Sequence, residues 1–240
     1  MSCRLVGMDL AGAKADIILL QEVDVNCRRT HHVNVATEIA KKLEMNYVFG
    51  QEFQELTQGS KTSPAYHGQA TLSRWPLSKP RIIRFRKQSD FWRPHWFLPE
   101  VSPFQERLGG RMALVSEVNF AGETIFTYNL HLESRGDDEL RCAQLDETLS
   151  DAKRYTWDTP ILLAGDFNID ASGDLRLAQS AALNFRMHSR TATGRRPLAH
   201  SGSMDGSSIG SLPMAALVSA NLKCTVQFRL PTTIRFPSTW

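Results

Sequence analysis

The sequence predicts an α/β sandwich, on three observations. Helical and strand-like segments alternate along the chain, which indicates a mixed fold. Neighbouring strand-like segments are also joined by tight turns, a connection that a doubly wound parallel sheet does not use. The chain of 240 residues shows no internal repeat and no linker, and it is long enough for one domain with its own core.

The first predicted elements begin with a buried strand. Residues 16–20 read D-I-I-L-L and lead directly to Glu22, and so short an apolar run favours a strand over a helix. Apolar residues at helical spacing then predict a helix over 35–43. Two further strand-like stretches follow this helix, at 47–50 and at 68–77.

The next elements are better patterned. The spacing predicts strands over 112–120 and 123–133, joined by a tight turn at Ala121-Gly122. Apolar and polar residues alternate in the second strand, so it has one apolar and one polar face. A helix over 137–153 begins with acidic residues and ends near basic ones, as the helix dipole favours, and a buried strand follows at 161–164.

Composition limits the classes of protein. Hydrophobic residues make up 42% and charged residues 22%, and the net charge of +3 is too small to indicate nucleic-acid binding by itself. The four cysteines form no C-x-x-C pair, so neither a zinc site nor a disulfide framework is predicted. No signal peptide and no transmembrane apolar run is visible, and we expect a cytoplasmic location without an obligate protein partner.

Acidic and amide side chains follow two of the apolar runs. Glu22 follows the first run, and Asp166 and Asn168 follow I-L-L-A-G. Strand ends can present polar groups to a cleft, and Mg²⁺ binds one or two carboxylates while keeping waters or phosphate oxygens. Glu22 and Asp166 could supply those carboxylates, and Asn168 could orient a nucleophile or hold a phosphate oxygen.

His131 and Arg111 are candidates for contacting a phosphate. His131 lies on the polar face of its strand, and Arg111 follows a Gly-Gly pair. Both could stabilise negative charge that develops in a transition state. Taken singly, each candidate has an ordinary reading, as a solvated strand end, a satisfied histidine, a turn or a surface charge. Their order along the chain favours a shared site.

Four motifs carry a resemblance to a known family. They read L-L-Q-E-V, G-Q-A-T-L-S-R-W-P-L, N-L-H-L-E-S and L-L-A-G-D-F-N, at 19–23, 68–77, 129–134 and 162–168. In this order they resemble the successive motifs of the endonuclease/exonuclease/phosphatase superfamily, which includes deoxyribonuclease I. The resemblance runs from about residue 13 to residue 170 and says little about the substrate.

The resemblance implies a four-layered α-β-β-α sandwich of two mainly antiparallel sheets. It implies a divalent-metal-dependent hydrolase of phosphate esters, with Mg²⁺ as the cofactor and Mn²⁺ as an alternative. The resemblance implies Glu22 as a metal ligand, His131 as a catalytic residue that contacts the phosphate, and Asp166 and Asn168 as the catalytic pair that orients the water and the phosphate. The residue types alone add Asp166 as a second metal ligand and Arg111, with Asn168, as substrate-binding residues. Arg141 and Gln144 match an R-x-x-Q pattern with a structural role.

The chain departs from the family pattern at both ends. No strand ending in Asn is visible in 1–12, and the S-D-H motif is absent because no histidine follows His200. Deleting one base from codons for M-D-W-I-F gives M-D-G-S-S, as at 204–208, and the same shift at 231–240 can restore S-D-H. We therefore expect one domain over 1–240, family-like over about 13–205, with an out-of-frame tail at 206–240 and a sandwich incomplete at both termini. Asp205 would be the last catalytic residue of the family in the chain.

Alternative functions remain open at this point. One is a truncated or frameshifted member without catalytic activity, and another is a phospholipid or sphingolipid phosphodiesterase. The segment 81–99 interleaves basic and aromatic residues. It could stack nucleic-acid bases, lie on a membrane surface, or simply cover the edge of the sandwich. The predicted partner is a phosphate-ester substrate, with nucleic acid as one candidate.

Overall fold

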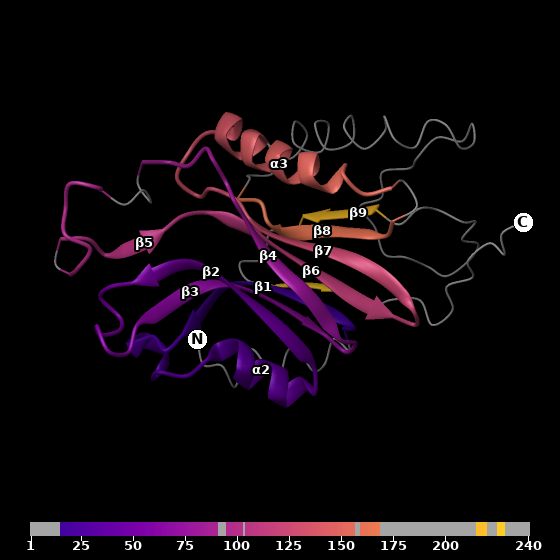
Figure 1. Ribbon diagram of the computed structural model, residues 1–240, viewed down its shortest axis with the longest axis horizontal. Coiled ribbons are helices and arrows are strands. Elements are labelled where there is room, and N and C mark those ends of the chain that lie inside the picture. Colours follow the sequence, from indigo (N-terminus) through magenta and orange to yellow (C-terminus); the bar gives the residue numbers. More distant parts are fainter. Residues whose placement is uncertain are drawn as a thin grey trace, which may run out of the picture.

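Two five-stranded sheets pack face to face, with a helix on the outer side of each (Figure 1). The computed structural model describes residues 15–90, 95–102, 104–156 and 159–168, and the strands at 215–219 and 225–228. This arrangement confirms the predicted four-layered α-β-β-α sandwich. Within the described residues, no helix is long and apolar enough to span a membrane.

The first sheet is antiparallel throughout, in the order β10-β1-β3-β2-β5. Helix α2 (Val35–Leu43) covers its outer face, as predicted, and begins where the Asn34 side chain accepts a 3.1 Å hydrogen bond from the backbone of Thr37. A 3-10 helix η1 (Arg28–Thr30) precedes it. The strands are β1 (Ile17–Val25), β2 (Asn46–Glu55), β3 (Ala65–Ser73), β5 (Arg107–Gly109) and β10 (Thr225–Phe228).

The second sheet has the order β4-β6-β7-β8-β9, and only the β7–β8 and β8–β9 pairs are parallel. Helix α3 (Asp138–Ala152) connects β7 to β8, because parallel neighbours need a crossover. The Asp137 side chain caps it with a 2.8 Å hydrogen bond from the backbone of Leu140. The strands are β4 (Leu77–Arg84), β6 (Met112–Phe120), β7 (Glu123–His131), β8 (Ile161–Asp166) and β9 (Ala215–Ser219).

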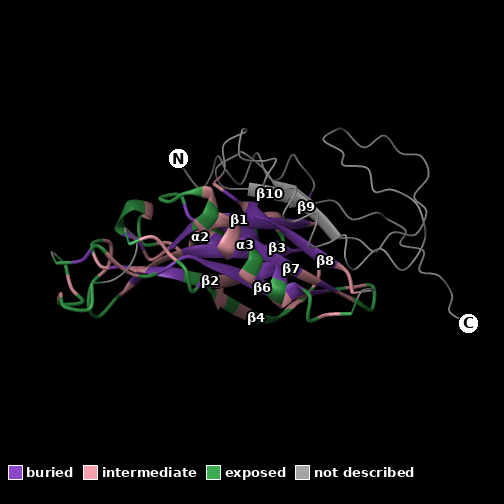
Figure 2. Cartoon of the chain, turned by 90° about the horizontal axis from the view of Figure 1, so that it is seen from above, coloured by how far each residue is buried: buried purple, intermediate pink, exposed green. Residues whose placement is uncertain are grey.

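Three apolar clusters fill the spaces between the layers, and buried residues run along both sheets (Figure 2). Each cluster stabilises the fold by removing apolar surface from water. The cluster beneath α3 includes Tyr128, Leu130, Leu145 and Leu149, that beneath α2 includes Ile18, Leu20, Ile39 and Leu72, and that between the sheets includes Ile17, Leu19, Val118 and Leu162.

A polar bridge also joins the two sheets. Gln21 Nε2 donates a 2.6 Å hydrogen bond to Asn129 Oδ1, and Asn129 Nδ2 donates to the carbonyls of Leu20 and Ala70 at 3.1 and 3.0 Å. The predicted polar face of the second strand is therefore the inner face of β7, and both faces of this strand are buried. The first sheet buries the polar face of β7, and α3 covers its apolar face.

Several predicted strand limits were wrong. The stretch 68–77 is two strands, because β3 ends at Ser73 and β4 begins at Leu77, after Pro76. The two strands belong to different sheets, and Pro76 lies in the turn where the chain crosses from one sheet to the other. The first strand also extends past Glu22 to Val25, and the strand predicted at 47–50 extends to Glu55.

The chain end adds one strand to each sheet. β9 pairs with β8, and β10 pairs with β1. These pairings do not test the reading frame, so the out-of-frame tail at 206–240 stays a prediction. The expectations for residues 1–12 and for Asp205 lie outside the described residues.

Candidate active site

Two irregularities of the first sheet meet at Gly68. The register shifts between Leu20 and Val23 in β1 and between Gln51 and Phe53 in β2, and Gly68 of β3 pairs with both Val23 and Gln51. A Cβ at Gly68 would lie 2.0 Å from the carbonyl oxygen of Gly50, so no larger residue fits there. These bulges on either side of Gly68 contain Glu22 and Glu52, and a bulge re-aims the side chain that it carries.

Glu22 lies inside β1, and the expectation that it ends the strand was wrong. Its φ of 55° is unusual for a residue other than glycine and marks the bulge. The side chain is exposed and has no hydrogen bond or ion pair with another described residue. Its carboxylate is thus available to an external ligand.

Glu52, Arg111 and His131 form a buried network between the sheets. Arg111 Nη1 donates a 2.7 Å hydrogen bond to Glu52 Oε1 and lies 2.9 and 3.1 Å from the two ring nitrogens of His131. Glu52 Oε2 lies 3.3 Å from Nδ1 of the same ring. The residues are 0%, 4% and 1% exposed, so all three are shielded from bulk water.

The network keeps Glu52 ionised. Burial alone would raise the pKa of this carboxyl, but the neighbouring His131 and Arg111 outweigh it and lower the pKa to about 2. An ionised carboxylate therefore lies beneath His131 at neutral pH.

Arg111 is fixed at its backbone and at its side chain. Its amide donates a 2.7 Å hydrogen bond to Gln88 Oε1, and its Nη2 donates to Ser134 Oγ at 3.0 Å. The ordinary reading of this arginine as a surface charge was wrong, because only 4% of the residue is exposed. These contacts hold the residue at both its backbone and its guanidinium.

Asp166 and Asn168 lie beside His131. His131 and Asp166 are paired in register where β7 and β8 end together. The Asn168 backbone donates a 2.8 Å hydrogen bond to Asp166 Oδ1, and its Nδ2 donates to the carbonyl of Leu132 at the same 2.8 Å. Asn168 has a φ of 51°, a conformation that asparagine tolerates better than most residues. The turn after β8 thus holds both polar side chains rigidly.

The structure brings most of the predicted site residues to one end of the sandwich. His131, Asp166 and Asn168 are adjacent at one end of the second sheet, and Arg111, which follows β5, contacts His131. Glu22 follows Gln21, whose side chain contacts Asn129 of β7. Asp205 lies outside the described residues.

Sequence reasoning missed Glu52 and Ser134. Glu52 interrupts Y-V-F-G-Q-E-F, and a lone acidic residue inside a buried strand was the signal that could have pointed to it.

The residues of the R-x-x-Q pattern support the backbone of Glu133, next to Ser134. Arg141 Nη1 donates to the Glu133 carbonyl at 3.1 Å, and Gln144 Oε1 accepts from the Glu133 amide at 2.9 Å.

The acidic side chains of the site offer carboxylates for a magnesium ion but no complete set of protein ligands. Among the described residues, no group of three or more His, Cys, Asp or Glu side chains could hold a metal. Mg²⁺ needs only one or two carboxylates, with waters and phosphate oxygens completing its shell. The available carboxylate of Glu22 and the half-buried carboxylate of Asp166 suit that requirement.

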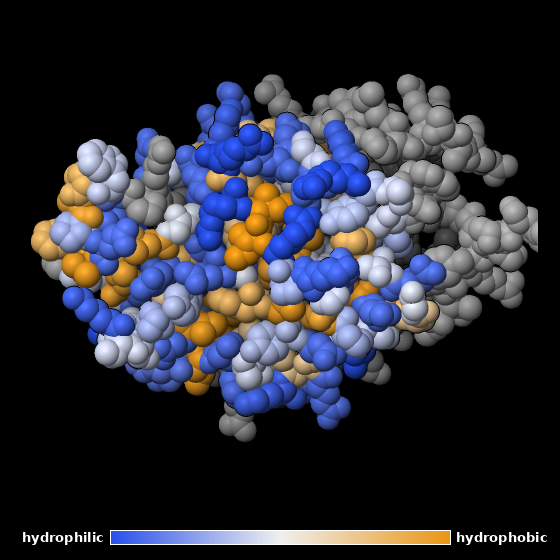
Figure 3. All heavy atoms as spheres, viewed as in Figure 1, coloured by the Kyte–Doolittle hydropathy of each residue, from blue (hydrophilic) through white to orange (hydrophobic). Residues whose placement is uncertain are grey.

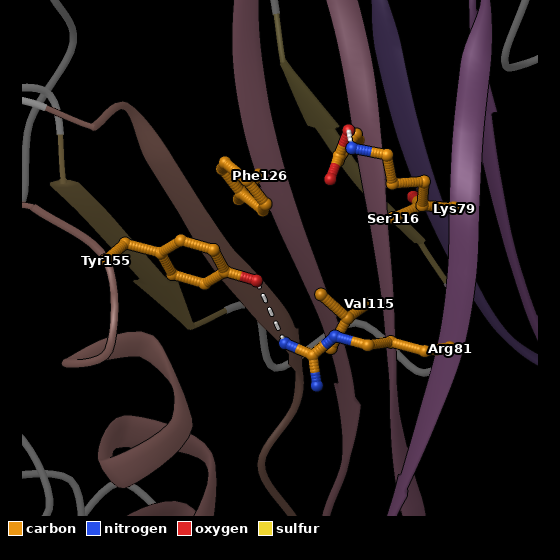
Figure 4. Close-up of a pocket in the computed structure, with 7 residues that line it drawn as sticks. Lys79, Arg81, Val115, Ser116, Phe126 and Tyr155 are labelled. Atoms are coloured by element: carbon orange, nitrogen blue, oxygen red, sulfur yellow. Dashed lines mark hydrogen bonds and ion pairs between the residues drawn. The ribbon is translucent and has the colours of Figure 1, made fainter.

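A hollow on the outer face of the second sheet is a different kind of feature (Figure 4). Arg81 extends into it and donates a 3.1 Å hydrogen bond to the Tyr155 hydroxyl, while Asp151 forms an ion pair with the same guanidinium. Its volume of about 130 Å³ is below the roughly 300 Å³ of small ligand sites. These contacts anchor the end of α3 to β4, and the candidate site residues do not line this hollow.

Comparison with known proteins supports the same fold. A sequence model described as "Endonuclease/Exonuclease/phosphatase family" matches residues 5–208. No curated protein sequence is significantly similar to the chain.

Three solved structures illustrate the likeness. A humanized D. rerio TDP2 is 20% identical with a TM-score of 0.46, and the alignment covers 73% of this chain and 62% of that one. Sphingomyelinase C from Streptomyces griseocarneus is 18% identical with a TM-score of 0.49, over 77% and 66%. Beta toxin from Staphylococcus aureus is 13% identical with a TM-score of 0.50, over 76% and 62%. The chain thus spans less than two thirds of the first of these, and identities this low indicate the fold alone.

Proposed function

Because this chain belongs to the endonuclease/exonuclease/phosphatase family, we propose that it hydrolyses a phosphate ester, and a phosphodiester in particular. The observation that supports this most is the buried Glu52–Arg111–His131 network beside Asp166 and Asn168. A buried arginine with a fixed guanidinium is well suited to stabilise an anionic group, since few waters compete with it. The rest of the proposal assigns roles around that network.

In the proposed reaction, His131 and Arg111 stabilise the charge that develops on the phosphate oxygens. Glu52 keeps both groups in place from below, because its two carboxylate oxygens contact Arg111 and His131 separately. Preorganised donors of this kind contribute most where water is excluded. His131 and Arg111 are thus the substrate-side groups, and Glu52 is a positioning residue.

Asp166 and Asn168 would orient the attacking water and the phosphate. Their rigid turn, with the Asn168 amide donating to Asp166 Oδ1 at 2.8 Å, limits the motion of both side chains. Holding a nucleophile in place removes part of the entropic barrier to attack. We assign Asn168 to substrate binding as well, and we keep Asp205 as a proposed catalytic residue.

Glu22 and Asp166 would hold Mg²⁺, or Mn²⁺ in its place. Such an ion, when bound, neutralises charge on the phosphate and lowers the pKa of a coordinated water. Glu22 is well suited to this role because its exposed carboxylate contacts no other described side chain.

The test is hydrolysis of bis-p-nitrophenyl phosphate by the full chain, in Mg²⁺ and in EDTA. We expect turnover in Mg²⁺ only, and a loss of about 100-fold or more in Glu22→Gln and in His131→Ala. Glu123→Gln is the matched control, since Glu123 is also an exposed glutamate and begins β7, at the end of the strand away from His131. Mg²⁺ binding by calorimetry should weaken in Glu22→Gln and stay unchanged in the control.

A version of the chain with the S-D-H reading frame restored is assayed in parallel. Turnover in the restored version alone would assign the missing activity to the tail at 206–240 and support the proposed site. Absence of turnover in both versions, or equal rates in Mg²⁺ and EDTA, would overturn the proposed function.

A further inference from the structure

The loop between β4 and β5 exposes a cluster of large aromatic side chains. Trp96, Phe97 and Phe104 are 93%, 64% and 56% exposed, and they are three of the four large hydrophobic residues exposed among the described residues. The loop lies at the left end of the molecule in Figure 1, where apolar atoms break the polar surface in Figure 3. A contiguous patch of exposed apolar side chains often marks an interaction site. Phe85, in the same segment 81–99, is buried in the cluster beneath α3, and the reading that the aromatics of this segment cover the sandwich edge stays a prediction.

The aromatic loop, residues 95–106, is held in a defined shape by Gln105. This side chain is 7% exposed, and its Oε1 accepts a 2.9 Å hydrogen bond from the backbone of His95. Its Nε2 donates to the carbonyls of His95, Leu98 and Pro99 at 3.3, 3.1 and 3.3 Å. A buried amide that ties together both sides of the loop keeps the rings outward, so binding would cost little ordering entropy.

The described segments before and after the aromatic loop are attached beside the candidate site. On the side that follows β4, Gln88 Oε1 accepts from the Arg111 amide at 2.7 Å, and the Ser89 amide donates to Glu133 Oε2 at 3.2 Å. On the other side, β5 pairs with β2, and the Gly110 amide donates to the Glu52 carbonyl at 3.1 Å. The aromatic loop therefore projects from the rim of the proposed active site.

The charges on the aromatic loop argue against a polyanionic partner. Residues 91–106 contain one arginine, Arg93, against Glu100 and Glu106, and Arg107, which follows, forms an ion pair with Glu55 at 3.3 Å. Nucleic-acid affinity depends on basic side chains that neutralise phosphates, and anionic lipid surfaces require them too. A partner surface without net charge would not repel Glu100 and Glu106.

The shape of the aromatic loop favours a lipid surface over a protein pocket. Trp96 and Phe97 have ring centroids 5.9 Å apart at an interplanar angle of 86°, and each ring stands out into solvent. A protein partner would need a separate deep pocket for each ring, whereas the headgroup region of a bilayer adapts to any shape. Tryptophan in particular favours that interfacial region.

We propose that the aromatic loop inserts Trp96, Phe97 and Phe104 into the headgroup region of a neutral, zwitterionic phospholipid membrane and docks the candidate site against it. The inference concerns a binding surface, and it holds whether or not the chain hydrolyses a phosphate ester.

The experiment is co-sedimentation of the full chain with phosphatidylcholine vesicles in EDTA, where hydrolysis does not contribute. We expect binding that persists at 0.5 M salt, because ionic screening acts only on charge interactions. The double variant Trp96→Ala/Phe97→Ala should lower the partition coefficient about tenfold or more, and Phe104→Ala about threefold. Ile82→Ala is the matched control, since Ile82 is an exposed apolar residue on β4 and should bind as the unaltered chain does.

Quenching of tryptophan fluorescence by brominated phosphatidylcholine gives a second readout. Quenching should be strong in the unaltered chain and should fall in Trp96→Phe, a change that preserves an aromatic ring. Failure of the unaltered chain to bind these vesicles, or equal binding by the double variant, would overturn the proposal. Salt-sensitive binding of oligothymidylate that the double variant loses would overturn it in favour of a single-stranded nucleic acid.

Discussion

Arg111 and Glu52 form a 2.7 Å ion pair in which neither side chain is more than 5% exposed. Removing one partner of such a pair leaves a buried charge without compensation, which costs about 3–5 kcal/mol. We therefore expect Arg111→Met to lower the free energy of unfolding by roughly that amount, measured by urea denaturation.

The double variant Glu52→Gln/Arg111→Met completes a double-mutant cycle, which measures the coupling between the two residues. With both charges gone, no uncompensated charge remains, so the double variant should be more stable than Arg111→Met alone. Additive losses in the two single variants would contradict a coupled pair.

The lowered pKa of Glu52 should make the free energy of unfolding depend on pH. Its pKa is lowered from the ordinary value of 4.5 to about 2 in the folded protein, so ionised Glu52 stabilises the fold above pH 4.5, and this contribution is lost as the pH falls toward 2. Its size is on the order of 3 kcal/mol. Urea unfolding from pH 7 to pH 3 should show a steeper acid loss in the unaltered chain than in Glu52→Gln. Parallel curves for the two proteins would be inconsistent with a lowered pKa.

Gly68→Ala should disrupt the two bulges that position Glu22 and Glu52. The added methyl group would lie 2.0 Å from the Gly50 carbonyl oxygen, which is backbone and cannot move aside alone. We expect a loss of about 3 kcal/mol or more in stability. Gly122→Ala is the comparison, because Gly122 has a φ of 91° but open space around it, so strain alone should cost only about 1 kcal/mol. Equal losses in the two variants would refute the steric explanation.

Cys27 should resist alkylation in the folded protein. Burial raises the pKa of its thiol to about 12, with Asp24 adding to the effect, and its Sγ lies 3.3 Å from the Tyr66 carbonyl. Cys142 is half-buried and should react with iodoacetamide at pH 8. Peptide mapping by mass spectrometry should find Cys27 modified only after unfolding in urea. Modification of native Cys27 at the rate of Cys142 would show that the thiol is accessible.

The elements with local signals were the predictable ones. Both predicted helices agree with the structure to within a residue, because apolar spacing marks the first and an acidic start marks the second, and both signals are local in the sequence. Glu52 was missed because its role depends on Arg111, which lies 59 residues away in the sequence. The limits of β1 were missed because Glu22 forms a bulge that neighbouring strands impose on it. The buried His131 was identified by its motif, while its burial followed from packing against the other sheet.

The polar bridge between the sheets has a consequence for synthesis of the chain. Gln21 and Asn129, which it joins, are 108 residues apart, so the ribosome must produce more than half of the chain before the two sheets can meet. Until then, the nascent first sheet presents Gln21, Gln69 and Thr71 among the apolar residues of its inner face. These polar groups can hydrogen-bond to water until the second sheet has been synthesised. We expect this to lower the tendency of the nascent chain to aggregate.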